Sequence, residues 1–205
     1  MKHLSFLIAS GLGLAMAGSA SADKLTLDEI SAYLQRIGAA QTSFTQINED
    51  NSISTGTLMI KRPGRARFEY DPPEAALVMA GGGQIAIFDL KSNEPPENYP
   101  LRKTPLWVIL ERNVNLKNRD MVVGHSYDGE VTTVRALDPK NPDRGAIEMH
   151  FADNPVRLSQ WVIQDGSGSE TTVVLGDLDH SVKLENKLFN ITRMTNIVAP
   201  ERDDD

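Results

Sequence analysis

Between residues 42 and 89, the sequence divides into five short segments with a period of two, most clearly where Ala66, Phe68 and Tyr70 alternate with charged residues. A period of two is typical of β-strands, whose successive side chains point to opposite faces of the sheet. Only short polar or Gly/Pro-rich breaks separate the segments, so consecutive strands are expected to pair as antiparallel hairpins. The expected strands are 42–47, 53–61, 66–71, 75–80 and 84–89.

Two of these strands are apolar at both parities, over Leu77–Ala80 and Ile85–Phe88. A strand with one wet face alternates cleanly, so both faces of these strands are expected to be covered. With the later strands, we predict a mainly β (α+β) fold: one strongly curved antiparallel sheet of about ten or eleven strands with two or three short helices as a lid. The later strands are expected at 121–127, 131–137, 147–151, 161–163 and 171–175; residues 91–103 are expected to form a loop, and 188–191 a closing strand or a tucked tail.

A capping box opens the first expected helix. Thr26 stands at the N-cap position, Glu29 follows three residues later, and Gly38 is placed to end the helix. Its amphipathic pattern predicts that one stripe is free to cover an apolar surface. The stripe consists of Leu27, Ile30, Leu34 and Ile37.

Thr104 and Pro105 open a second helix, as its cap and its first helical residue. From Leu106 through Trp107 to Leu110 the segment is apolar nearly all round, so it must be buried or must cover an apolar surface. Such a helix, beside strands that are apolar on both faces, indicates an interior that one sheet cannot fill. That interior could bind a hydrophobic ligand.

Arg62 ends a row of apolar side chains, because it shares strand parity with Leu58 and Ile60 and directly precedes the turn at Pro63-Gly64. A desolvated, unpaired guanidinium at the rim of an apolar surface would cost several kcal/mol. Two interpretations are open. The aliphatic stem lies on the sheet and the head reaches water, or the head bonds carbonyls at a helix end or in a loop folded over that face.

The first 22 residues are expected to be a cleaved signal peptide. Lys2-His3 is a basic n-region, Leu4–Met16 is an apolar h-region too short to span a bilayer, and Ala20-Ser21-Ala22 is a small-residue cleavage site. Cleavage would leave an exported single domain, residues 23–205. Its acidic end, 201–205, is expected to be a solvated, mobile tail.

Charge and cysteine content restrict the function further. The chain has no cysteine, so its stability must come from the core and not from disulfides. Its 21 Lys and Arg stand against 28 Asp and Glu, a formal charge of −7 that becomes about −8 when Lys2 leaves. An acidic chain is not expected to bind nucleic acid or to dock electrostatically on anionic lipid.

Patterns typical of catalysis or metal binding are scarce, which predicts a protein that is not an enzyme and needs no cofactor or metal. Gly166–Ser169 has the character of a hairpin turn and not of a nucleophile elbow. Gly81–Gly83 precedes a strand and not a helix, so it is no phosphate cradle. Asp177–His180 lacks the glycine and glutamate of a calcium loop. The histidines of the mature chain have no ligand-like spacing; they are His125, His150 and His180.

Several short motifs, in order, resemble the LolA family of periplasmic lipoprotein carriers of Gram-negative bacteria. The resemblance covers most of residues 27–115; beyond about residue 120 it rests on strand rhythm and Leu188-Phe189. The motifs are Phe44-Thr45-Gln46, Gly56-Thr57-Leu58, Lys61-Arg62-Pro63-Gly64, Phe68-x-Tyr70, Pro72-Pro73, Leu77-Val78, Phe88-Asp89 and Thr104-Pro105-Leu106 with Leu110. This chain departs from the family pattern at Ala66, Gly81–Gly83 and Ala86.

The resemblance implies an unclosed half-barrel whose lid encloses a cavity for the acyl chains of outer-membrane lipoproteins. It implies cargo transfer in the periplasm from an inner-membrane lipoprotein-releasing ABC transporter to the outer membrane, through a receptor lipoprotein where one exists. A shuttle that presents one rim to two membranes in turn is expected to be a monomer. The family's gating arginine corresponds to Arg62, which favours the interpretation that its head bonds lid carbonyls.

On this hypothesis, helices 27–37 and 106–111 close over the concave face of the sheet. The lid residues would be Leu27, Ile30, Leu34, Leu106, Trp107 and Leu110, and the acyl-chain cavity would be lined by Leu58, Ile60, Phe68, Tyr70, Met79 and Ile87. The alternative is a half-barrel lipid or lipoprotein sensor that regulates an envelope stress pathway. A lipid-acting hydrolase is disfavoured because the sequence shows no nucleophile-base pair.

Overall fold

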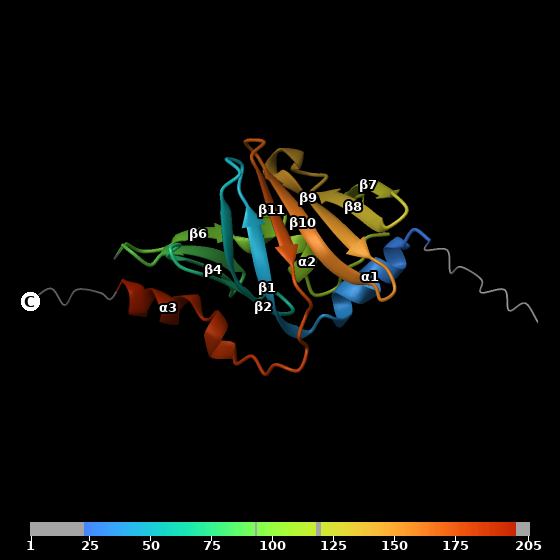
Figure 1. Ribbon diagram of the computed structural model, residues 1–205. Coiled ribbons are helices and arrows are strands. Elements are labelled where there is room, and N and C mark those ends of the chain that lie inside the picture. The colour runs from blue at the N-terminus through green and yellow to red at the C-terminus, as the bar shows by residue number, and fades with distance from the viewer. Residues whose placement is uncertain (1–22, 93, 118–119, 200–205) are drawn as a thin grey trace, which may run out of the picture.

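The computed structural model describes residues 23–92, 94–117 and 120–199; the expected signal peptide and acidic tail lie outside these ranges. Eleven strands of the described residues form one antiparallel sheet in the order β6-β5-β4-β3-β2-β1-β11-β10-β9-β8-β7 (Figure 1). Because β6 and β7 stand at opposite ends of this order, the sheet is unclosed. The strands are β1 (Ala39–Ile47), β2 (Ile53–Lys61), β3 (Ala66–Tyr70), β4 (Ala76–Gly81), β5 (Gln84–Asp89), β6 (Glu97–Pro100), β7 (Val122–Tyr127), β8 (Val131–Leu137), β9 (Gly145–Ala152), β10 (Arg157–Asp165) and β11 (Glu170–Leu175).

The predicted fold class is confirmed, and the period-two segments all form strands. One expectation is wrong: residues 91–103 are not entirely loop, because β6 lies within them and pairs with β5, with Tyr99 opposite Ile85. All four residues of β6 are exposed, so an apolar pattern could not reveal it. Backbone hydrogen bonds to an edge are enough to hold such a short strand, and Pro100 is tolerated there.

The sheet curves strongly, and its concave face carries the main core. Phe68 on β3 and Trp161 on β10 are four strand positions apart, which would separate them by about 19 Å in a flat sheet. Their ring centroids nevertheless lie 6.3 Å apart, edge to face across the hollow of the sheet. Phe44 on β1 packs edge-on against the Phe68 ring, with centroids 5.6 Å apart. Aromatic side chains from opposite walls therefore meet across the hollow of the half-barrel.

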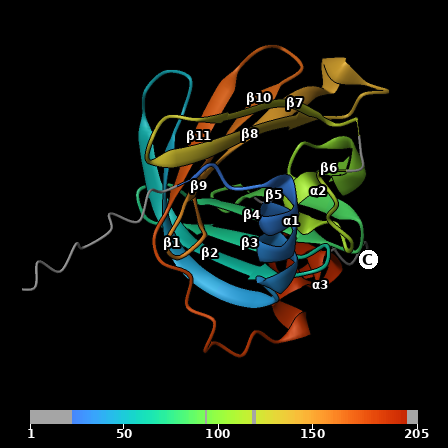
Figure 2. The same cartoon turned by 90° about the vertical axis from the view of Figure 1, so that its right-hand side faces the viewer.

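Three α-helices lie on the described part of the sheet: α1 (Leu27–Arg36), α2 (Trp107–Leu110) and α3 (Ile191–Val198). Figure 2 shows α1 and α2 within the curve of the sheet. The predicted capping box is present, since the Glu29 backbone N–H donates to Thr26 Oγ1 (3.2 Å) and the Thr26 N–H donates to Glu29 Oε2 (2.8 Å). Thr104 does not cap α2; its hydroxyl donates to the Leu101 carbonyl and closes the preceding 3₁₀ turn (2.8 Å).

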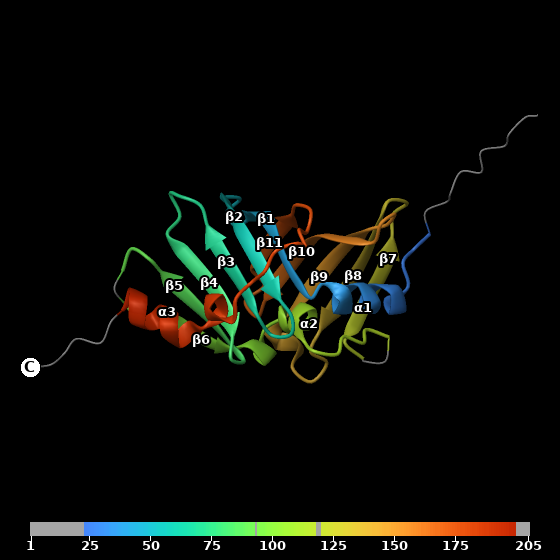
Figure 3. The same cartoon turned by 90° about the horizontal axis from the view of Figure 1, so that it is seen from below.

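The last helix, α3, covers the convex face of β4 and β5 (Figure 3). Its Ile191 and Met194 pack on a second apolar cluster that includes Leu77 and Phe88. The expected cover on both faces of these two strands is thus confirmed. Residues 188–191 form no closing strand: Leu188 and Phe189 belong to a 3₁₀-helix, Asn186–Phe189, and Ile191 begins α3. The other alternative, a tucked tail, agrees with the burial of Phe189 and the packing of Ile191 on the sheet.

Gly81 sets how closely the C-terminal segment approaches the sheet. A Cβ at this position would stand 2.2 Å from the Phe189 carbonyl oxygen. We expect Gly81→Ala to lower the free energy of unfolding by about 1–3 kcal/mol, as overpacking does, and to speed trypsin cleavage at Lys187 and Arg193. Denaturant titration and timed proteolysis measure both effects. Gly124→Ala is the matched control, because its Cβ meets only Arg135 Cβ at 3.3 Å; equal protection of both variants would contradict the prediction.

Candidate functional site

An apolar cavity of about 400 Å³ lies on the concave face, between the sheet and the start of the lid. Of the residues expected to line it, Phe68, Tyr70 and Ile87 do so. Ile87 remains 39% exposed, so the cavity reaches the surface there. Strands from both halves of the sheet contribute the other apolar wall residues, which are Val78, Ile85, Trp161, Ile163 and Val173, and Pro105 and Leu106 come from the lid.

The other three expected lining residues lie elsewhere. Leu58 and Ile60 face the concave side but are buried in the packed core beneath the lid. Met79 points the opposite way, to the convex cluster under α3, so its expected place in the cavity is wrong. The inward residue of β4 is its neighbour Val78, which pairs with Ile87 across the strands. Because β4 is apolar on both faces, its pattern could not show which parity is inward.

The six expected lid residues all belong to the lid or its edge. Ile30 and Leu34 on α1 have no exposed surface, and Leu110 on α2 is similarly buried. Leu106 directly precedes α2 and lines the cavity. Leu27 is partly buried against the same core. Trp107 is half-buried, and the Arg102 guanidinium lies over its ring at 4.9 Å from the centroid.

The turn at Arg62–Gly64, here called the Arg62 turn, bonds the ends of both lid helices. The Arg62 backbone N–H donates to the Gly38 carbonyl just after α1 (2.7 Å), and the Gly64 N–H donates to the Leu110 carbonyl at the end of α2 (2.8 Å). The Arg62 side chain donates through Nη2 to the carbonyl of Glu111. Gly64 has a positive φ of 72°, which glycine adopts without strain and which turns its N–H toward α2. Arg62 therefore points to the apolar face, as its parity predicts.

The Arg62 guanidinium is largely desolvated. Its Nε and Nη1 atoms are buried without a hydrogen-bond partner among the described residues. Burial lowers the pKa of Arg62 below its ordinary value, and the nearby negative charge of Glu111 opposes that shift. An arginine stays charged in proteins, so this cation lies in a poorly solvated site. Its hydrogen bond to the Glu111 carbonyl and the nearby Glu111 charge offset the desolvation.

The two lid helices are also linked to each other. The Tyr33 hydroxyl on α1 accepts a hydrogen bond from the Leu158 N–H of β10 (3.1 Å), which anchors α1 to the sheet. In the segment after α2, the Leu116 N–H donates to Ser31 Oγ on α1 (3.0 Å). The start of α2 thus lies at the cavity and its end at the Arg62 turn, with α1 packed alongside.

Tyr70 contributes a polar hydroxyl to the cavity wall. Its hydroxyl donates to Gln46 Oε1 (2.7 Å), and burial is the main cause that raises the pKa of Tyr70 to about 12. The unfolded chain would lose this proton near pH 10 while the folded chain keeps it. Stability from Tyr70 is therefore complete below about pH 10 and disappears as the pH rises to about 12.

We expect the free energy of unfolding to fall by about 2–3 kcal/mol over that interval because of Tyr70. Denaturant titrations at a series of pH values measure the fall, and Tyr70→Phe should remove this part of it. Tyr127→Phe is the comparison: its hydroxyl donates to the Gly129 carbonyl, and its pKa is also raised, but without the large shift of Tyr70. A Tyr70→Phe protein with the same pH dependence as Tyr127→Phe would contradict the prediction.

Sequence reasoning missed the part of the site that comes from distant segments. Trp161, Ile163 and Val173 were recognised as strand residues, but nothing in their spacing placed them opposite Phe68. Glu111 marked only the end of the second helix, although its carbonyl receives Arg62 and its side chain is 4% exposed. The proximity of this buried carboxylate to the Arg62 guanidinium arises only in the folded protein, so the sequence could not indicate it.

The described residues offer little for other chemistries. Across the ranges 23–92, 94–117 and 120–199, no three His, Asp or Glu side chains gather closely enough to hold a metal ion. Among those same residues, no helix combines the length and apolar character needed to cross a membrane. The site consists of an apolar cavity and a helical lid that is hydrogen-bonded to the Arg62 turn.

Fold and site together define a class of protein: an unclosed antiparallel half-barrel with a helical lid over an apolar cavity. Residues 35–192 match the family described as outer membrane lipoprotein carrier protein LolA, and the chain belongs to this family. The resemblance seen in the sequence is thereby confirmed.

Individual relatives are distant. An outer-membrane lipoprotein carrier protein of Nitrosomonas europaea is 24% identical over 178 residues, which cover 80% of this chain and 82% of that one. Another, of Pseudomonas paraeruginosa, is 21% identical over 199 residues, covering 92% and 94%. The crystal structure of a LolA superfamily protein from Nitrosomonas europaea superposes with a TM-score of 0.45 at 11% identity, covering 81% of this chain and 98% of that one.

Proposed function

We propose that this protein is a periplasmic carrier that shields the acyl chains of outer-membrane lipoproteins between an inner-membrane ABC exporter and the outer membrane. The observation that carries the proposal is the Arg62 turn, which ties the ends of both lid helices to the sheet that walls the apolar cavity. Membership of a family of lipoprotein carriers supports it. In this proposal the protein works as a monomer, and it catalyses no reaction.

The energetic need for such a carrier is large. Each methylene moved from an apolar environment into water costs about 0.8 kcal/mol, and a lipoprotein has up to three acyl chains of many methylenes. Free diffusion across an aqueous compartment would therefore face a barrier on the order of tens of kcal/mol. A soluble protein removes that barrier if it keeps the chains out of water.

The apolar cavity, of about 400 Å³, is small beside a cargo of up to three long acyl chains. In this proposal loading enlarges the cavity by moving the segment around α2. Leu106, which directly precedes α2, lines the cavity, and Glu111, which follows it, accepts the Arg62 hydrogen bond.

The Arg62 turn then acts as the gate of this lid. In the empty protein its bonds to Gly38, Leu110 and Glu111 hold the lid closed. Cargo breaks the side-chain bond to Glu111, and the Arg62 head becomes hydrated. Because the loaded state has lost this bond, part of the binding free energy of the acyl chains is offset and the cargo can leave. An outer-membrane receptor lipoprotein, where present, would accept it.

A transfer experiment tests the proposal. Spheroplasts that synthesise a labelled outer-membrane lipoprotein are incubated with the purified mature protein, and the soluble fraction is examined for a one-to-one complex. Release of label into that complex is the expected result. Label that stays on the inner membrane would exclude the carrier and favour a half-barrel that binds a hydrophobic ligand as a sensor.

A further inference from the structure

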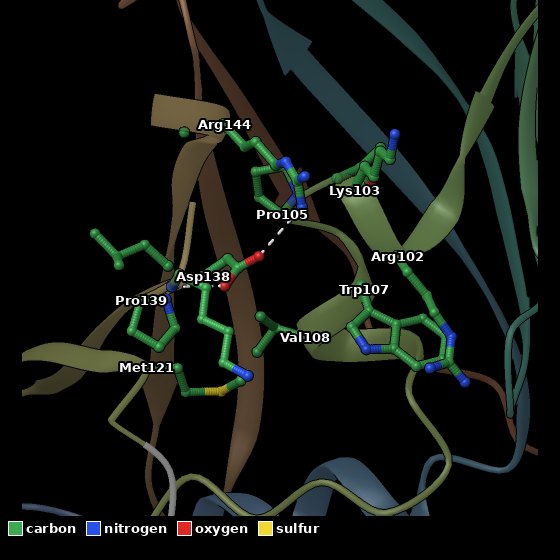
Figure 4. A pocket seen from close by; sticks show the side chains of 13 residues that line it. Arg102, Lys103, Pro105, Trp107, Val108, Met121, Asp138, Pro139 and Arg144 are labelled. Carbon is green, nitrogen blue, oxygen red and sulfur yellow. Dashed lines mark hydrogen bonds and ion pairs between the residues drawn. The ribbon is translucent and has the colours of Figure 1, made fainter. Parts of the chain in front are cut away.

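A second cleft, of about 430 Å³, lies beside the apolar cavity, between the 3₁₀ turn Leu101–Lys103 with α2 on one side and the turn from β8 to β9 on the other. Its rim is cationic although the chain as a whole has a formal charge of −7. Four basic side chains and one carboxylate, Asp138, line it (Figure 4). The basic residues of this cationic cleft are Arg102, Lys103, Lys140 and Arg144.

Most of this positive charge is not neutralised. Lys103, Lys140 and Arg102 form no ion pair with any residue in the described ranges. Arg144 pairs with Asp138 at 3.3 Å, but both side chains are more than a third exposed, and ion pairs of that kind contribute little. The cleft therefore has an excess of three positive charges to offer an anion.

The Asp138 carboxylate has hydrogen-bond partners besides Arg144. Its carboxylate accepts hydrogen bonds from the Lys140 backbone N–H (2.9 Å) and from Asn141 Nδ2 (2.8 Å) within its own turn. These two bonds are the main causes that lower the pKa of Asp138. Arg144 can turn from Asp138 to another anion and leave the carboxylate hydrogen-bonded. In Figure 4 the Arg144 side chain reaches toward Pro105, at the boundary with the apolar cavity.

The cationic cleft and the apolar cavity share a wall. Lys103, Thr104, Pro105 and Arg144 line both of them. An anion held in the cleft would thus lie at the entrance of a chamber whose wall is mostly aliphatic and aromatic, with Gln46, Thr171 and the carboxylate of Asp165 also lining it. A ligand that fills both spaces must combine a compact negative group with acyl chains in one molecule.

We propose that the cationic cleft binds the phosphate of an anionic glycerophospholipid whose acyl chains enter the apolar cavity. The Arg144 guanidinium can donate two parallel hydrogen bonds to a phosphate, and Lys103 adds a point charge from the opposite wall. An acidic peptide would leave the apolar cavity unused. The inference rests on the proposed function, because it uses the same acyl-chain cavity, and it extends the ligands of that cavity to a second class of amphiphile.

Calorimetric titration with water-soluble short-chain lipids tests the inference on the intact mature protein. Dioctanoyl phosphatidylglycerol and dioctanoyl phosphatidylcholine have the same chains, but only the first has a net negative charge. We expect the anionic lipid to bind at least about tenfold more tightly at low salt, the effect of one charge-assisted hydrogen bond. The difference should shrink as ionic strength rises.

The double variant Lys103→Gln, Arg144→Gln should lose this preference and bind the two lipids with similar affinity. Lys91→Gln removes an exposed lysine that lines neither cleft nor cavity and should keep the preference. Circular dichroism spectra and melting curves verify that the variants are folded.

Two results would overturn the inference. Equal affinity for the two lipids would show that the cleft does not select a net negative headgroup over a zwitterionic one. Equal affinity for phosphatidylglycerol and its deacylated headgroup, glycerophosphoglycerol, would show a phosphate site that does not use the acyl-chain cavity. Both outcomes are independent of the lipoprotein release experiment, which alone decides whether the protein is a lipoprotein carrier.

Discussion

Arg62→Leu is expected to give a protein that takes up lipoprotein but retains it about 10- to 100-fold longer than the unchanged protein. The side-chain bond to Glu111 is charge-assisted, and such bonds contribute about 1.5–3 kcal/mol. Leucine removes that bond from the closed state and offers an apolar side chain to the acyl chains in the loaded state. Both changes shift the equilibrium toward the loaded protein.

Pulse-labelled lipoprotein on the purified carrier, followed during transfer to outer-membrane vesicles, measures the retention. Arg65→Leu is the matched control, because Arg65 lies on the same hairpin but bonds Asn186 on the convex side (2.9 Å). We expect Arg65→Leu to deliver at the normal rate. Normal delivery by Arg62→Leu would exclude the gate.

The second large effect is expected from a charge in the cavity wall. Ile163 on β10 lines the apolar cavity and is half-buried, so Ile163→Glu leaves the new carboxylate hydrated in the empty protein. An acyl chain that enters would have to strip this water, at a cost of several kcal/mol. We expect at least a 100-fold loss of affinity for acylated cargo, which corresponds to about 2.7 kcal/mol.

Val162→Glu is the control for this variant. Val162 is the preceding residue of β10, also half-buried, and its side chain points to the other face of the sheet. Titration with a fluorescent fatty acid and recovery of the soluble lipoprotein complex measure the affinity. If both variants bind equally well, the cavity described here is not where acyl chains lie.

The two variants at Arg62 and Ile163 also separate gate from container. Loss of the gate should increase retention, whereas a charged wall should prevent loading. If only Arg62→Leu has its expected effect, the proposed cavity is wrong. If only Ile163→Glu has its expected effect, the proposed gate is wrong. The pair therefore tests the proposed mechanism more strictly than either change does alone.

Local patterns were sufficient for most secondary structure and for the direction of one critical side chain. Thr26 and Glu29 form a capping box from residues three apart, so no tertiary contact is needed to predict it. Arg62 points to the concave face because strand alternation relates it to Leu58 and Ile60. These conclusions hold because they depend on the backbone period and on neighbours in sequence.

The alternation of apolar residues could not show which side of a strand faces inward when both sides are apolar. It also could not reveal a strand that has no apolar side. Met79 and Val78 are both apolar, so only the position of α3 decides that Met79 faces outward. The edge strand β6 is exposed throughout and is held by backbone pairing with β5. In both cases the deciding interaction comes from a different segment of the chain.

Residue patterns are enough to predict an antiparallel, mainly β chain with a capped amphipathic helix, an apolar helix, and an arginine that faces the apolar side of its strand. They do not predict which carbonyl receives Arg62, which residues line the cavity or where the cations gather, because these depend on how the folded chain packs. The cavity joins Phe68 to Trp161 and the cleft joins Lys103 to Arg144, pairs that are far apart in the chain. Such pairs meet because the sheet curves and β1 pairs with β11, and the curvature depends on packing summed over the whole sheet.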